Sequence, residues 1–151
     1  MNTQPDSTIE QAARQLVARA VAVVGLAGVA LIHVLDGIDK FAETPYMGWM
    51  YVGLIIASLG TAAALIWGNV REAWLAALLI PLSAMAGFIL TRTVGLPQAT
   101  GDIGNWSEPL GVASLFVEAC LVLVSGVALT ALAPVKKLVR GRGRDRTLVT
   151  A

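Results

Sequence analysis

Hydrophobic residues along this chain fall into four long runs separated by short polar segments. The runs cover about 16–35, 46–67, 73–90 and 112–132. A helix needs roughly 20 mostly apolar residues to cross the hydrocarbon core of a bilayer, so each run predicts one transmembrane helix. The third run is the shortest and contains Pro81, which we expect to bend its helix. The pattern predicts an all-α polytopic membrane protein built as a bundle of four transmembrane helices.

Polar segments flank this predicted bundle on both sides. Residues 1–13 form a polar N-terminal segment, 14–134 the four-helix transmembrane domain, and 135–151 a basic tail that we expect to be disordered. Asp6 and Glu10 make the N-terminal segment unlike the basic start of a secretory signal peptide. Ser7-Thr8-Ile9-Glu10 matches a capping box, which predicts that the first helix begins there.

The composition supports a membrane protein and excludes several other classes. The 151 residues are 56% hydrophobic and 14% charged, whereas a soluble domain is about a quarter charged. Cys120 is the only cysteine and His33 the only histidine, which excludes an internal disulfide and bis-histidine haem ligation within one chain. No phosphate-binding glycine loop, catalytic nucleophile motif or zinc motif is present. We therefore expect no cofactor and no metal, and the sequence favours a non-enzymatic role.

The distribution of basic residues predicts how the bundle is oriented. Nine of the eleven lie on one side of the predicted spans: Arg14, Arg19, Arg71, Lys136, Lys137, Arg140, Arg142, Arg144 and Arg146. Only Lys40 and Arg92 lie on the other side. Cytoplasmic loops carry the excess of Lys and Arg. The pattern therefore predicts a multi-pass plasma-membrane protein with both termini in the cytoplasm.

One group of polar residues stands out within or beside the apolar runs. His33 and Asp36 are three residues apart and share a face if the first helix continues outward. Arg92 ends the third run, and Glu118 lies about two turns inside the fourth. Charged residues inside a membrane are costly and normally have a partner or a function. We expect these four residues to converge in the outer half of the bundle.

Three interpretations of this group remain open. The first is a structural polar network in which Arg92 pairs with Glu118 or Asp36. The second is a ligand site, with Arg92 receiving the anionic group of a small organic molecule or lipid; a metal is disfavoured because only one nitrogen donor is present and Arg92 would repel a cation. The third is a proton or ion path, which is disfavoured because the polar residues stop halfway along the spans.

The outer segment 91–110 is rich in turn-forming residues: Gly95, Pro97, Gly101, Gly104 and Pro109. Such residues predict a loop that folds onto the helix ends. Trp106 is a candidate anchor for this loop, and Glu108 a candidate member of the polar group. The loop could serve as a lid over a site or as a structural plug.

The run Arg92-Thr93-Val94-Gly95-Leu96-Pro97, followed by Trp106, the segment 108–113 and Glu118, resembles a group of small four-span membrane proteins common in actinobacteria. A histidine near the outer end of the first span, as His33 is here, is also typical of that group. The resemblance covers most of residues 20–125 and implies architecture but no activity. It departs at Ser114, where members often carry an acid.

Small and aromatic residues predict packing and membrane boundaries. Gly53, Ala57 and Thr61 form a stripe that predicts a helix contact, as do Gly25 and Gly28 in the first span. Amphipathic rings prefer the headgroup level. On that basis five aromatic residues are predicted to lie at the interfaces: Tyr46, Trp49, Tyr51, Trp67 and Trp74.

The expected partners are the lipid bilayer and a second copy of the chain or another membrane protein, and no nucleic acid. Anionic lipid is a candidate ligand of the basic tail, through Lys136, Lys137, Arg140, Arg142, Arg144 and Arg146. The sequence favours a binding or accessory component whose outward face carries a polar pocket or network. A small oligomeric transporter or channel subunit is the alternative.

Overall fold

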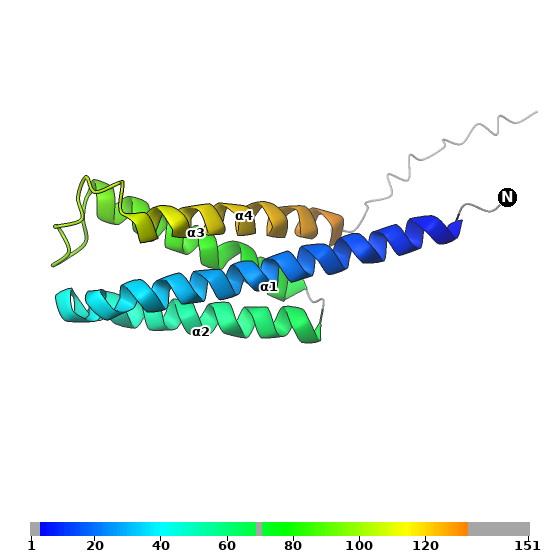
Figure 1. Ribbon diagram of the computed structural model, residues 1–151, viewed down its shortest axis with the longest axis horizontal. Coiled ribbons are helices and arrows are strands. Elements are labelled where there is room, and N and C mark those ends of the chain that lie inside the picture. Colours follow the sequence, from blue (N-terminus) through cyan, green and yellow to red (C-terminus); the bar gives the residue numbers. More distant parts are fainter. Residues whose placement is uncertain (1–3, 69–70, 133–151) are drawn as a thin grey trace, which may run out of the picture.

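The computed structural model describes residues 4–68 and 71–132 and consists of four helices (Figure 1). These are α1 (Gln4–Glu43), α2 (Pro45–Trp67), α3 (Arg71–Thr93) and α4 (Pro109–Leu132). The described residues contain no β-strand, only an isolated bridge between Leu96 and Ala99. All four helices are long and apolar enough to span a membrane. The predicted all-α, four-helix architecture is confirmed.

The helices form an antiparallel bundle in which each packs against its neighbours in chain order and α4 returns to α1 (Figure 1). The α1–α2 turn and the loop 94–108 between α3 and α4 lie at one end, which we call the loop end. The first turns of α1 and the last turn of α4 lie at the opposite end, where α1 extends past the other helices (Figure 1).

The first helix begins earlier than the sequence predicted. Gln4 is already helical, so the helix does not begin at the segment 7–10, and the capping-box prediction was wrong. Pro5 lies in the first turn, where its fixed φ suits a helix start and its missing N–H costs nothing. At its other end α1 continues through Gly37 to Glu43. Thr44 alone separates α1 from α2, because a residue before proline avoids the helical conformation.

The core lies between the helices, while their outer faces carry large apolar side chains. Leu26, Leu65 and Leu121 from α1, α2 and α4 are at most 2% exposed. Val24 and Phe116, in contrast, are each 71% exposed. A continuous apolar surface of this kind is unfavourable in water and suits a lipid environment. The fold is therefore that of a multi-pass membrane protein.

Of the two packing predictions, the one for the first span is confirmed and the one for α2 differs from the structure. A Cβ atom at Gly25 would lie 2.8 Å from Cγ of Leu121, so this glycine does permit a close approach of α1 and α4. A Cβ atom at Gly53 would meet nothing within 4 Å, and Ala57 is exposed. Gly53 and Ala57 thus border open space towards α3 instead of a helix contact, whereas Thr61, the third member of the stripe, is 8% exposed. The close approach of α2 to α1 is made at Gly48, against the ring of Phe41.

The aromatic residues expected at the interfaces do not all lie on the surface. Trp67 is 86% exposed at the end of α2, but Trp74 is 3% exposed and belongs to the hydrophobic core. Trp74 lies one turn inside α3, where its side chain packs between helices and not towards the boundary. The expectation of an interfacial ring was therefore wrong for Trp74.

Candidate functional site

Arg92, in the last turn of α3, is held by the loop that follows it. Its side chain is 5% exposed, and Nη1 lies 3.3 Å from Oδ2 of Asp102. Nη2 forms an ion pair with Glu108, and Nε donates a 2.8 Å hydrogen bond to the carbonyl of Asn105. The guanidinium also lies over the ring of Phe88, 4.6 Å from its centroid. Two carboxylates and an aromatic face therefore stabilise this buried cation.

Lys40 joins the same arrangement from the last turn of α1. Its Nζ lies 3.0 Å from Glu43 and 3.2 Å from Oδ2 of Asp102. One oxygen of Asp102 thus contacts cations on both α1 and α3. We call Lys40, Glu43, Arg92, Asp102 and Glu108 the loop-end network. It ties the loop to two helices, and it contains two cations and three carboxylates.

The remaining loop contacts are hydrogen bonds to the helix ends. Tyr46 Oη donates to the carbonyl of Pro97 at 2.7 Å, and the N–H of Gly104 donates to the carbonyl of Arg92 at 3.0 Å. Gly95 and Gly104 have φ values of 75° and 80°, which glycine adopts without strain. The loop is folded onto the helix ends, as its glycine and proline content predicted.

Trp106 does not anchor this loop. Trp106 is 49% exposed, and its ring lies edge-on to that of Phe88, with 6.0 Å between the centroids. The loop residue that is buried is instead Ala99, which is 9% exposed. The ion pairs of Arg92 take the anchoring role that the sequence assigned to an aromatic ring, because a buried cation requires fixed partners.

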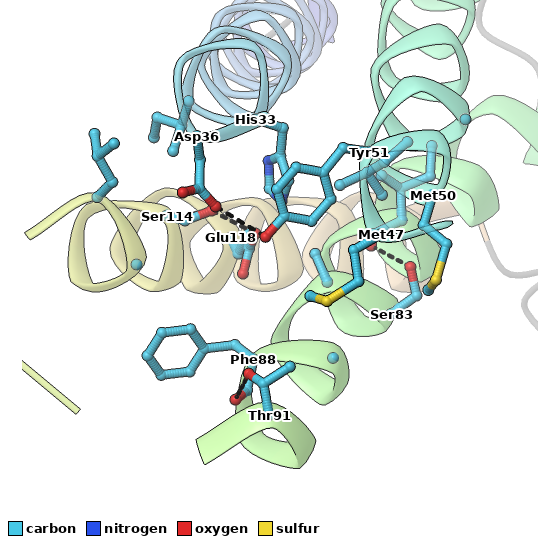
Figure 2. A pocket seen from close by; sticks show the side chains of 18 of the residues that line it. His33, Asp36, Met47, Met50, Tyr51, Ser83, Phe88, Thr91, Ser114 and Glu118 are labelled. Carbon is cyan, nitrogen blue, oxygen red and sulfur yellow. Dashed lines mark hydrogen bonds between the residues drawn. The ribbon is translucent and has the colours of Figure 1, made fainter. Parts of the chain in front are cut away.

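A cavity of about 430 Å³ lies beneath the loop-end network, between all four helices (Figure 2). Its α1 and α4 side carries four polar groups: His33, Asp36, Ser114 and Glu118. Its α2 and α3 side is largely apolar, with Tyr51, Ser83 and Thr91 among apolar residues that include Met47, Met50, Leu54, Ala57, Ile80, Ala84, Gly87 and Phe88. Arg92 and Glu108 contribute at the loop end. The cavity is therefore amphipathic, with a polar wall facing an apolar one.

Asp36 and His33 form the α1 part of the polar wall together with Tyr51 of α2. Tyr51 Oη donates a 2.8 Å hydrogen bond to Oδ2 of Asp36 across the α1–α2 interface (Figure 2). His33 packs edge-on against the ring of Tyr51, with 4.9 Å between centroids. Nδ1 of His33 lies 2.9 Å from the carbonyl of Val29, so Nδ1 carries the proton of this bond and Nε2 of the neutral ring is an acceptor.

Glu118 forms the α4 part of the polar wall. It is 1% exposed and accepts a 2.6 Å hydrogen bond from Oγ of Ser114, one turn earlier on the same helix. Neither Glu118 nor Asp36 has an ion-pair partner among the described residues. Each is satisfied in part by one neutral hydroxyl, so the polar wall is rich in acceptors and has no cation of its own.

The structure divides the predicted polar group in two. All four residues line the cavity, but the Arg92 guanidinium is paired with Asp102 and Glu108, whereas His33, Asp36 and Glu118 have no ion-pair partner in the described part of the chain. The pairing of Arg92 with Glu118 or Asp36, which the first of the three interpretations assumed, is not formed, because Asp102 and Glu108 are the partners of Arg92. Trp106 does not line the cavity. Within residues 8–68 and 71–132, no three His, Cys, Asp or Glu side chains are placed to hold a metal ion.

Several members of the site were not predicted to belong to it. Ser114 was named only as the position where the resemblance departs, although a residue four positions before Glu118 shares its helical face. Tyr51 was interpreted as an interfacial ring, and Lys40 as an outward charge. Asp102 carried no signal, because its position depends on the loop conformation. The six basic residues 136–146 proposed for anionic lipid lie outside the described residues.

Comparisons of the chain with protein-family models, with curated proteins and with solved structures gave no match. The fold defines the class, a multi-pass membrane protein with four helices. Within that class, the cavity and its lining residues are the features that indicate a function.

Proposed function

We propose that this protein is a ligand-binding component of the plasma membrane that holds a small amphipathic molecule in the cavity between its helices. The observation that carries the proposal is the amphipathic cavity itself. Its volume, about 430 Å³, falls within the range of small-molecule sites, which combine apolar walls with a few convergent polar groups. Asp36 and Glu118 retain acceptor capacity beyond their single hydroxyl donors.

The route into the cavity supports a ligand that comes from the bilayer. Gly53 and Ala57 on α2 and Ser83 on α3 line the cavity and are exposed on the surface. The opening therefore lies between α2 and α3. Ala57 is about 18 Å along α2 from its start at the loop end, at 1.5 Å per residue. That depth is inside the hydrocarbon region of a spanning helix.

The proposed orientation places the loop end outside the cell and both termini in the cytoplasm. It rests on the excess of Lys and Arg near the opposite end. In this orientation the loop-end network separates the cavity from external water. The network is tightly paired, so it supports the plug interpretation of the loop more than a mobile lid.

A binding role is better supported than transport. The polar lining residues His33, Asp36, Arg92 and Glu118 all belong to the loop-end half of the helices. A second hollow of about 590 Å³ continues between α2 and α3 towards the other end, and of the described residues that form its wall only Thr61 and Glu72 are polar. A conducting path needs polar groups across the whole membrane.

The proposal can be tested by native mass spectrometry of the full chain released from detergent with decylamine, decanol and decanoate present in equal amounts. We expect a one-to-one adduct with at least one of the three. The double variant Gly53→Trp/Ala57→Trp fills the opening and should lose the adduct while keeping its helical circular dichroism. The proposal fails if wild type retains no probe, or if the filled variant retains the probe equally well.

A further inference from the structure

We infer that the cavity selects an amphiphile with a cationic, amine-type head, whose alkyl tail extends between α2 and α3 into the second hollow. This inference rests on the proposed function and specifies the chemical class of its ligand. It follows from which charges near the cavity are already neutralised and which are not.

The cations at the loop end are not available to a ligand. Arg92 donates to Asp102, Glu108, Asn105 and the hydroxyl of Thr91. Lys40 is held between Glu43 and Asp102 and does not line the cavity. An anionic head such as a carboxylate or phosphate would therefore displace an existing ion pair to gain a partner. This reverses the expectation that Arg92 receives an anion.

The carboxyl groups on the polar wall, unlike the cations at the loop end, are not neutralised by an ion pair within residues 4–68 and 71–132. Asp36 and Glu118 have neutral hydroxyl donors and no cation among the described residues. An anion placed between them would be repelled, whereas an ammonium group donates three hydrogen bonds and supplies the missing charge. His33 lines the same cavity, and its Nε2 is a further acceptor. The wall is complementary to a hydrogen-bond donor that carries a positive charge.

The apolar remainder of the ligand has a continuous path. Ala57 and Ile80 line both the cavity and the second hollow, so the two spaces adjoin between α2 and α3. Beyond them the second hollow is bordered by Gly60 and Ala64 on α2 and by Ala76 on α3. Small side chains leave room for an alkyl chain along the helix pair. An apolar transmembrane helix of a partner that covered this groove would leave Asp36 and Glu118 without a cation.

The affinities of decylamine, decanol and decanoate for the full chain in nanodiscs, measured by equilibrium dialysis against empty discs, test this inference. We expect decylamine to bind at least tenfold more tightly than decanoate, with decanol between them. Asp36→Asn and Glu118→Gln should each weaken decylamine about tenfold and leave decanol within threefold. Asp39→Asn, an exposed acid at the same end, is the matched control and should change neither. Gly60→Trp should weaken decylamine but not butylamine.

The possible outcomes separate the two proposals. If none of the probes is retained above empty discs, the proposed function itself is wrong. If decanoate or decanol binds most tightly, or the three bind equally, the cavity binds ligands but the cationic head is refuted. Binding of decylamine at wild-type affinity by both Asp36→Asn and Glu118→Gln would also overturn the inference. Two variants are used so that misfolding of one of them does not decide the result. Unchanged decylamine binding in Gly60→Trp would refute the path of the tail.

Discussion

Tyr51 Oη of α2 donates a 2.8 Å hydrogen bond to Oδ2 of Asp36 on α1, and this bond holds the carboxyl group at the wall of the cavity. Hydrogen bonds to charged groups contribute about 1.5–3 kcal/mol. We therefore expect Tyr51→Phe and Asp36→Asn each to lower the midpoint of thermal unfolding in detergent. The losses in the double variant should be less than additive, because both substitutions remove one interaction. Strict additivity would show that the bond does not form.

Asp102 links Lys40 to Arg92, and its removal should loosen the loop. Asp102→Asn leaves two buried cations short of a carboxylate, and we expect a loss of about 1.5–3 kcal/mol in unfolding free energy. Glu43→Gln is the matched control, since the Glu43 side chain is 62% exposed and exposed pairs contribute under about 1 kcal/mol. Limited proteolysis within residues 94–108 should accelerate only in Asp102→Asn. Equal sensitivity of both variants would contradict the bridging role.

Arg92 and Glu118 should behave independently of one another. The structure pairs Arg92 with Glu108 and Asp102, while Glu118 accepts from Ser114. Arg92→Met and Glu118→Gln should therefore destabilise the protein additively, within about 0.5 kcal/mol. Arg92→Met and Glu108→Gln should instead show an interaction term. Thermal unfolding of the three single and two double variants in detergent measures both couplings. A coupling of Arg92 to Glu118 larger than that to Glu108 would contradict the described site.

Much of this fold is predictable from the sequence, because the need for about 20 apolar residues per span is a local property. The convergence of His33, Asp36 and Glu118 followed from helix periodicity. The partners of Arg92 did not, because Asp102 reaches it only through a loop that turns at Gly95 and Gly104. Tyr51 was misjudged because a ring near a span end fits an interface as well as a cavity wall. The order of the helices along the chain does not determine which neighbouring pair lies farther apart. The opening between α2 and α3 beside Gly53 could therefore not be predicted.

Gly25 and Gly53 lie in the interiors of two spanning helices and offer a matched test of the open space. A Cβ atom at Gly25 would meet Leu121 at 2.8 Å, whereas one at Gly53 would meet nothing within 4 Å. Alanine is favoured over glycine in a helix interior by about 1 kcal/mol. Gly53→Ala should therefore maintain or raise the unfolding temperature, and Gly25→Ala should lower it. A drop for Gly53→Ala equal to that for Gly25→Ala would mean that α2 and α3 are closely packed there.

The proposed orientation can be tested with single cysteines in a Cys120→Ser background. Ser107 lies in the loop and Glu72 at the start of α3, at the opposite end, and both are exposed. In intact cells a membrane-impermeant maleimide should label Ser107→Cys and not Glu72→Cys. Both should be labelled after the cells are opened, which controls for reactivity. The reverse pattern in intact cells would invert the orientation.

The most direct test of the cavity as an amphiphile site is an experimental structure of the full chain with 10-bromodecylamine, read by the anomalous signal of bromine. We predict one bromine position between α2 and α3, close to Ala57, Gly60 and Ala76, with the amine density beside Asp36 and Glu118. Bromine only on the outer lipid-facing surface, or amine density at the loop-end network with the cavity empty, would contradict it.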